Sequence, residues 1–154
     1  YFIHDSYDSS DAVNRFDWGK ATDSQRYPEC VRTRDYTRGL IALRRSSDAF
    51  RQPTQELVER NVLLLKCPEI EANDLVIAWR CRASGGTTFY CFVNADGYSR
   101  RLSLTESLVG AQVVADGERV DPNGLSSPTG FQLSSRTISI EPLTAVIFKS
   151  ESRH

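Results

Sequence analysis

The chain has no methionine and only two histidines, His4 and His154, among its 154 residues. No apolar run approaches the roughly 20 residues that a membrane-spanning helix needs. The 19 basic and 20 acidic residues nearly cancel to a formal net charge of −1, so the charge balance favours neither nucleic acid nor an anionic membrane as a partner. What remains is ordinary globular composition, 40% hydrophobic and 25% charged, in a length typical of about one domain.

The chain is also poor in cysteine, with Cys30, Cys67, Cys81 and Cys91 and no C-x-x-C pair. A zinc site is not expected, because zinc ligands are usually closely spaced cysteines and histidines. Four cysteines can pair in three ways, and the sequence does not choose among them. Cys81 and Cys91 lie in apolar, strand-like runs, which favours buried free thiols. A secreted protein would also allow one disulfide.

Residues 1–32 are polar and irregular, rich in Asp, Ser and Arg, and predict a long loop. The chain opens on tyrosine, with no basic segment and apolar stretch of a signal peptide, so we interpret it as a processed or excised piece, with an engineered boundary as an equal alternative. Loops longer than about 15 residues are uncommon in compact domains and are often functional. The segment therefore suggests a binding role, or disorder if the rest of its site is missing.

Residues 34–50 predict one helix, because Leu40 and Leu43 share an apolar face with other residues at helical spacing. Pro53 would prevent the helix from continuing. Gly39 in its interior costs about 1 kcal/mol relative to alanine. A glycine at this position therefore suggests a close approach to a neighbouring element.

From residue 61 onward the pattern changes to short strands separated by turn signals such as Ser84-Gly85-Gly86. The predicted strands cover residues 62–65, 75–82, 87–94, 100–104, 112–115, 131–133, 137–140 and 144–148. Several short strands with frequent turns predict a mainly β chain that ends in an antiparallel β-sandwich.

Three segments resemble one enzyme family. Residues 6–18 read Ser-Tyr-Asp-Ser-Ser-Asp-Ala-Val-Asn-Arg-Phe-Asp-Trp, and this run resembles the segment before the last barrel helix of type I pullulanases, starch-debranching enzymes of the α-amylase superfamily (glycoside hydrolase family 13). Residues 36–51, Tyr-Thr-Arg-Gly-Leu-Ile-Ala-Leu-Arg-Arg-Ser-Ser-Asp-Ala-Phe-Arg, resemble the final barrel helix. Residues 140–148, Ile-Glu-Pro-Leu-Thr-Ala-Val-Ile-Phe, resemble the last strand of the family's C-terminal β domain.

The resemblance implies a parent enzyme that hydrolyses α-1,6-glucosidic links in pullulan, amylopectin and limit dextrins. Residues 1–52 would be the end of its (β/α)8 barrel, a substrate loop plus the last helix, and residues 53–154 its C-terminal sandwich. The catalytic carboxylates would lie upstream, so this piece alone is expected to be inactive. The remainder of the barrel, in the same or a companion chain, would be its partner.

The resemblance also sets expectations about the parent's surroundings. The parent would be extracellular or at a bacterial cell surface, with a cytoplasmic location as the alternative. No cofactor is required in this chain, although the parent could bind calcium, and neither nucleic acid nor a membrane is expected as a partner. Pullulanases and amylopullulanases are not separated, because linkage choice depends on upstream loops.

The loop carries Asp5, Asp8, Asp11 and Asp17, and its carboxylates first suggest the acid and nucleophile of glycoside hydrolysis. We set this interpretation aside, because a catalytic acid with a raised pKa needs a dry, buried site that a polar loop does not predict. His4 followed by Asp5 resembles a His-Asp motif of the superfamily only superficially, since its context does not match.

Asp11 and Arg15 are the stronger candidates. Their spacing, with Asn14 between them, matches an Asp-x-x-x-Arg pair that binds a glucose unit in the superfamily's donor subsites. A carboxylate accepts hydrogen bonds from two sugar hydroxyls, a guanidinium donates in a fixed fork, and Arg15 can hold Asp11 ionised. Asp8 is a weaker candidate for the same sugar. The alternative is an ion pair that merely stabilises a turn and contributes little.

The aromatic residues suggest packing more than sugar stacking. Tyr7, Phe16 and Trp18 are expected to pack beneath the loop. Alternation in the paired strands predicts core positions for Trp79, Phe89, Tyr90 and Phe92. An exposed aromatic such as Tyr98 would support the alternative function, a non-catalytic starch-binding or structural β-sandwich module.

Overall fold

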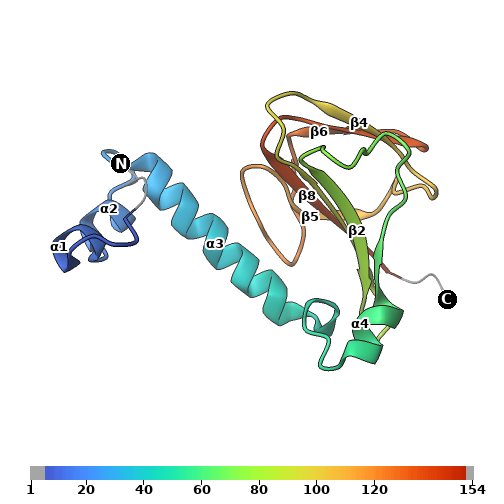
Figure 1. The fold of residues 1–154 in the computed structure, drawn as a ribbon, viewed down its shortest axis with the longest axis horizontal. Helices are drawn as coiled ribbons and strands as arrows, with labels where there is room; N and C mark the ends of the chain where they lie inside the picture. Colours follow the sequence, from blue (N-terminus) through green and yellow to red (C-terminus); the bar gives the residue numbers. More distant parts are fainter. Residues whose placement is uncertain (1–5, 152–154) are drawn as a thin grey trace. The chain divides into compact units, whose positions relative to one another are not determined.

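The computed structural model describes residues 6–151 (Figure 1). They divide into two compact units, one that ends at Arg38 and one that begins at Gly39. We call them the leading unit and the β-rich unit and describe each by itself. The sequence analysis placed the boundary between barrel and sandwich after residue 52, and that assignment stays a prediction.

The leading unit is helical rather than the single loop that the sequence predicted. It contains α1 (Asp11–Asn14), α2 (Trp18–Thr22) and the first part of α3 (Pro28–Ser46). The Asp17 side chain caps α2 by accepting a hydrogen bond from the backbone N–H of Lys20 at 3.2 Å. Helices of four and five residues with mostly exposed side chains carry almost no apolar period, which explains why the pattern missed them.

α3 begins earlier than residue 34, where the sequence analysis placed the helix start. Pro28 occupies its first position, where a fixed φ suits the helix and a missing N–H costs nothing. The helix ends at Ser46, and the expected continuation to residue 50 is a separate 3-10 turn, η1 (Asp48–Phe50). The Ser47 hydroxyl accepts a hydrogen bond from the Ala49 N–H at 3.2 Å and so starts this new turn.

A further helix, α4 (Gln55–Asn61), precedes the first strand and was not predicted. The Thr54 hydroxyl caps it by accepting from the Leu57 N–H at 3.3 Å. Glu56 in its first turn suits the positive end of the helix dipole. Because α4 buries none of its residues, no apolar stripe marked it in the sequence.

All eight predicted strands are present. They are β1 (Val62–Leu64), β2 (Val76–Arg82), β3 (Thr88–Asn94), β4 (Arg100–Ser103), β5 (Gln112–Ala115), β6 (Phe131–Leu133), β7 (Thr137–Ile140) and β8 (Thr144–Ser150). They form a five-stranded sheet in the order β1-β2-β3-β8-β5 and a three-stranded sheet in the order β4-β7-β6, with antiparallel pairing throughout. The predicted fold class, a mainly β chain with an antiparallel β module, is confirmed.

One hydrophobic core joins residues of the two sheets. Phe92 and Phe148 meet edge to face with ring centroids 6.0 Å apart, and Ile138 and Ile140 of β7 are fully buried in the same cluster. Phe89, Tyr90 and Phe92 are buried and Trp79 is half-buried, so their predicted core role is confirmed.

A second core cluster lies on the opposite face of the five-stranded sheet. Its side chains alternate along the strands with those of the first cluster. Cys81, Phe89 and Cys91 of β2 and β3 pack with Leu43 of α3 and Ala49 of η1. The prediction of buried thiols at Cys81 and Cys91 is confirmed, and all four cysteines are free. Part of the five-stranded sheet is therefore covered on both faces. The three-stranded sheet packs on one face, and residues of α3 and η1 pack on the other.

Gly39 lies where α3 meets the segment after β5. A Cβ atom at this position would stand 2.6 Å from the Val120 carbonyl oxygen and 2.7 Å from the Val120 Cβ. Both distances are too short for real contacts, so only glycine fits without a shift of the backbone. The predicted close approach is confirmed.

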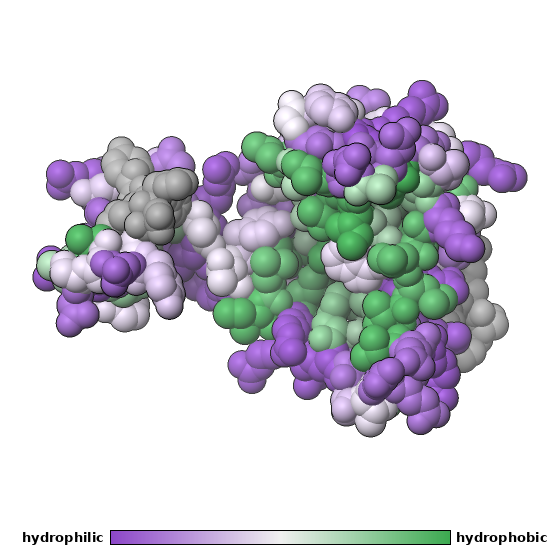
Figure 2. Space-filling view, viewed as in Figure 1, coloured by the Kyte–Doolittle hydropathy of each residue, from purple (hydrophilic) through white to green (hydrophobic). Residues whose placement is uncertain are grey.

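Apolar side chains gather on one face of the β-rich unit in the space-filling view (Figure 2). The large hydrophobic side chains exposed in this unit include Leu40, Ile41, Leu63, Leu64, Leu75 and Ile77. Within the described part of the chain, no helix has the length and apolar character to cross a membrane.

Candidate functional site

The three predicted site residues lie together at the start of the leading unit. Asp8 sits in a turn that the Ser9 N–H closes by donating to the Ser6 carbonyl at 3.0 Å. Asp11 is the first residue of α1, and Arg15 follows its last residue. All three side chains are exposed.

The backbone places Asp11 and Arg15 one helical turn apart. The Arg15 N–H donates to the Asp11 carbonyl oxygen at 2.8 Å. Both residues are described, and no ion pair joins their side chains, so the alternative of a turn-stabilising ion pair is not what the structure shows. Both charged groups are available to a ligand, and their role in sugar binding stays a prediction.

Asn14 holds this turn in place, a role that the sequence analysis missed. Its side-chain amide donates to the carbonyl oxygens of Ser6 and Ser9, at 2.9 and 3.0 Å. The sequence analysis treated Asn14 only as a spacer between Asp11 and Arg15. Because the neutral Asn14 amide fixes the backbone here, the charged groups of Asp11 and Arg15 are not needed for that role.

The aromatic residues of this segment are exposed rather than packed beneath it, which corrects our expectation. Tyr7 is 97% exposed, Phe16 63% and Trp18 75%. Phe16 and Trp18 contact each other edge to face, with ring centroids 4.7 Å apart. The pair His4-Asp5, which we had set aside, lies outside the described residues.

Polar contacts hold the rest of the leading unit together. The Arg34 guanidinium donates to the Ala21 carbonyl at 2.6 Å, which ties α2 to α3. Arg34 also pairs with Asp35 at 2.7 Å, and Asp35 pairs with Arg38 at 3.1 Å. Contacts of this exposed kind contribute little individually.

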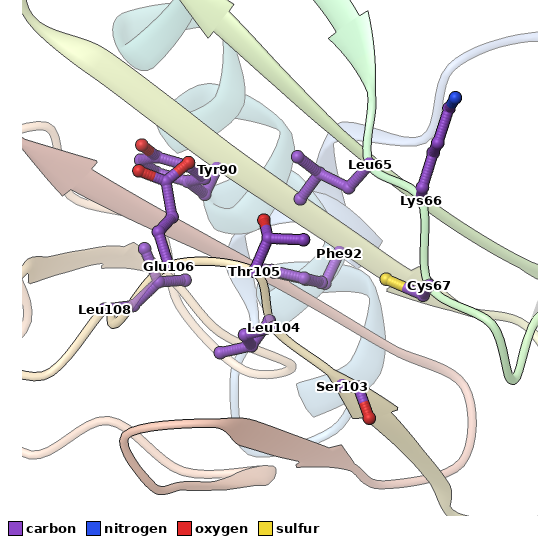
Figure 3. A pocket seen from close by; sticks show the side chains of 10 residues that line it. All are labelled: Leu65, Lys66, Cys67, Tyr90, Phe92, Ser103, Leu104, Thr105, Glu106 and Leu108. Atoms are coloured by element: carbon purple, nitrogen blue, oxygen red, sulfur yellow. The ribbon is translucent and has the colours of Figure 1, made fainter.

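The β-rich unit contains a small pocket between its two sheets, whose lining residues are labelled in Figure 3. Its volume of about 10 Å³ is room for about one water molecule and far too little for a sugar. Burial, followed by a hydrogen bond to Glu106, raises the pKa of Tyr90, and burial raises the pKa of the Cys67 thiol. Both groups therefore stay protonated, and the pocket is a packing gap.

The comparisons with known proteins place the chain in a family. Residues 61–151, which contain all eight strands and the turns between them, match the family model described as SpuA C-terminal. The chain belongs to the SpuA C-terminal family. Pullulanase A of Streptococcus pneumoniae serotype 4 is 43% identical over 155 aligned residues, which cover 97% of this chain. The predicted family resemblance is thus confirmed.

Solved structures extend the similarity to the leading unit. The pullulanase SAP of group B Streptococcus is 41% identical and superimposes with a TM-score of 0.84 over 97% of this chain. The catalytic module of the glycogen-degrading pneumococcal virulence factor SpuA is 40% identical, with a TM-score of 0.86 over 99% of this chain.

The chain spans only a small part of these SpuA-family relatives. It covers 12% of the length of the pneumococcal pullulanase A, 20% of the SAP chain and 22% of the SpuA catalytic module. Most of the length of these relatives therefore lies outside this chain.

Proposed function

We propose that this chain is the C-terminal part of a glycoside hydrolase that cleaves α-1,6-glucosidic links in pullulan, amylopectin and limit dextrins. One observation supports this most: 99% of the chain, leading unit included, superimposes on a catalytic module that is more than four times as long, since the chain covers 22% of it. The leading unit thus has its counterpart inside a catalytic module and is not an unrelated extension. The piece contributes a substrate loop and a stabilising β domain, and the catalytic carboxylates belong to the remainder.

In this proposal, Asp11 and Arg15 bind one glucose unit of the α-glucan. Asp11 accepts hydrogen bonds from two hydroxyls, and Arg15 donates to a neighbouring oxygen. Support comes from their exposure, from the missing ion pair between them and from the turn that Asn14 fixes. Asp8, in the adjoining turn, is a further contact to the same ligand.

The remainder of the barrel is the proposed partner of the apolar surfaces. Leu40 and Ile41 of α3 are 40% and 55% exposed, although they extend the apolar face that buries Leu43. In the leading unit Phe16 and Trp18 are exposed as well. Exposed apolar surface commonly marks an interface. Most of the length of the relatives lies outside this chain, and the corresponding part of the parent enzyme is the proposed cover of these side chains.

The test uses the whole enzyme and compares Asp11→Asn and Arg15→Lys with the exposed control Glu29→Gln, from the first turn of α3. Loss of a charged hydrogen bond costs about 1.5–3 kcal/mol, so kcat/KM on pullulan should fall about 10- to 150-fold in both variants. The control should keep wild-type kinetics. Wild-type kinetics in both loop variants would remove the substrate role.

A second experiment addresses the absent carboxylates. The 154-residue chain alone, incubated with pullulan, should release no reducing sugar. Robust hydrolysis without an added partner would show that the catalytic groups lie in this chain.

The alternative function, a carbohydrate-binding or structural sandwich, is supported by Tyr98, which is 60% exposed. The Arg100 guanidinium lies 5.5 Å from its ring centroid and donates to its hydroxyl at 3.1 Å, so one ring face is already occupied. Affinity electrophoresis in amylopectin distinguishes the two functions. Retardation of the chain that Tyr98→Ala abolishes would favour the binding module.

A further inference from the structure

A cleft of about 670 Å³ opens in the β-rich unit, within the size range of small-molecule sites and much larger than the gap between the sheets. Residues of η1, α4 and the β1–β2–β3 end of the five-stranded sheet line it. Its charged lining residues are Arg51, Arg60, Arg80, Arg82 and Asp48. In Figure 2 hydrophilic side chains gather at the lower margin of the β-rich unit, the region of α4 in Figure 1.

The strands supply one wall of this arginine cleft. Arg80 and Arg82 are two residues apart on β2, so their side chains point to the same face of the sheet. Leu63 of β1 lies opposite Arg80 and Thr88 of β3 lies opposite Arg82, and both line the cleft as well. The two arginine side chains therefore start from the same face of a rigid sheet.

The other wall carries Arg51, directly after η1, and Arg60 in the last turn of α4. The Arg51 guanidinium donates to the Arg44 carbonyl at 3.1 Å, which orients the group without neutralising it. Four arginines thus converge on one cleft in a chain whose formal net charge is −1.

The negative charge within reach compensates only part of this cluster. Asp48 accepts hydrogen bonds from the Ser84 N–H at 3.2 and 3.3 Å, and these bonds lower its pKa. Arg80 lies 3.4 Å from Glu106. Among the described residues, Arg60 and Arg82 form no ion pair. On α4 itself, Glu59 accepts from Gln55 at 2.8 Å.

We propose that this arginine cleft binds a small-molecule ligand that carries several phosphate groups. Guanidinium forks match phosphate oxygens in pairs, which is why arginine predominates where phosphate is recognised. The cleft exceeds the size of a single oxyanion, and its four arginines lie on two walls, so several phosphates can be bound together. The lining contains no aromatic ring on which a sugar would stack. This site is independent of the proposed hydrolase function.

The test is calorimetric titration of the 154-residue chain with sodium tripolyphosphate at low salt. We compare Arg60→Gln, Arg82→Gln and their double variant with Arg136→Gln, an exposed arginine outside the cleft. Each cleft variant should bind about tenfold more weakly, and the double variant about a hundredfold, as expected for charged hydrogen bonds. Added salt should weaken binding in wild type and control alike.

Two further measurements make the result decisive. Circular dichroism of each variant should give the wild-type spectrum, because the Arg60 and Arg82 side chains are exposed. Maltotetraose in place of tripolyphosphate should give no heat that depends on these arginines. The proposal is overturned if tripolyphosphate fails to bind, if the double variant binds like wild type, if Arg136→Gln loses as much affinity, or if maltotetraose binds through the same arginines.

Discussion

The leading unit and the β-rich unit differ in where their apolar side chains lie. Among the described hydrophobic residues before Gly39, only Ala21 is buried. The β-rich unit contains two core clusters, with Phe92 and Phe148 nearly inaccessible to solvent. Burial of apolar surface is the main favourable term in folding. The β-rich unit therefore carries its own stability, whereas the leading unit leaves its large apolar side chains exposed.

The polar contacts differ in the same way. In the β-rich unit, the buried Asn94 amide donates to the carbonyls of Tyr98, Ile140 and Glu141 at 3.0, 3.2 and 2.9 Å. In the leading unit, the Asn14 amide makes two comparable bonds while exposed to water. Buried hydrogen bonds are costly to break, whereas exposed ones are easily replaced by water. The same side chain thus secures a core in one unit and only a turn in the other.

The largest expected contrast comes from removing one aromatic ring in each unit. Phe92→Ala should lower the free energy of unfolding by about 3–5 kcal/mol, because it leaves a cavity in the sandwich core. Trp18→Ala should change it by less than about 0.5 kcal/mol, because the ring is already exposed. Urea unfolding followed by circular dichroism measures both. Equal losses would mean that the leading unit is part of the cooperative core.

An intermediate effect is expected at Gly39. Gly39→Ala places a Cβ atom against the Val120 backbone, and overpacking of this kind costs about 1–3 kcal/mol, more than the gain of about 1 kcal/mol in helix propensity. Gly97→Ala is the matched control, since a Cβ atom there meets nothing within 4 Å. Thermal unfolding of the two variants should separate them. A stabilised Gly39→Ala protein would show that α3 and the Val120 segment do not press together.

The smallest effect concerns acid stability of the β-rich unit. A hydrogen bond from Arg100, at 2.9 Å, is the main cause that lowers the pKa of Asp74 to about 2. This value lies below the ordinary carboxyl pKa of about 3.9. The ionised Asp74 side chain therefore stabilises the folded state fully above a pH of about 3.9, and this contribution is lost as the pH falls towards 2. Asp74→Asn should therefore reduce stability at pH 6 and flatten its decline below pH 4. Urea unfolding at a series of pH values measures this, and an Asp74→Asn protein with the wild-type profile would contradict the prediction.

Most of the β-rich unit could be predicted because its local signals agree with its tertiary structure. Buried residues alternate with half-buried ones along β7 and with an exposed one at the start of β2, and turn residues such as Gly85 and Gly86 separate the strands. The helices were harder. Pro28 marked the true start of α3 but was not used, and α4 lacks any buried residue that would have revealed it.

The two candidate sites differ in how far apart their residues lie in the sequence, and this difference decided which of them could be predicted. Asp11 and Arg15 were found through a local motif, and the structure brings them one helical turn apart. The arginine cleft joins Arg51 and Arg60 to Arg80 and Arg82 only through strand pairing and the position of α4. No spacing along the chain signals such a convergence.

The edges of the five-stranded sheet have a consequence for how the protein behaves at high concentration. The outer strand β1 is only three residues long. At the opposite edge, the segment after β5 covers it: the Asp121 and Leu125 N–H groups donate to the Val114 and Val113 carbonyls at 2.9 and 2.8 Å. Long, unpaired edges are what allow sheets of separate molecules to join and aggregate. With one edge short and the other capped by its own chain, the sheet gives a second molecule little to extend.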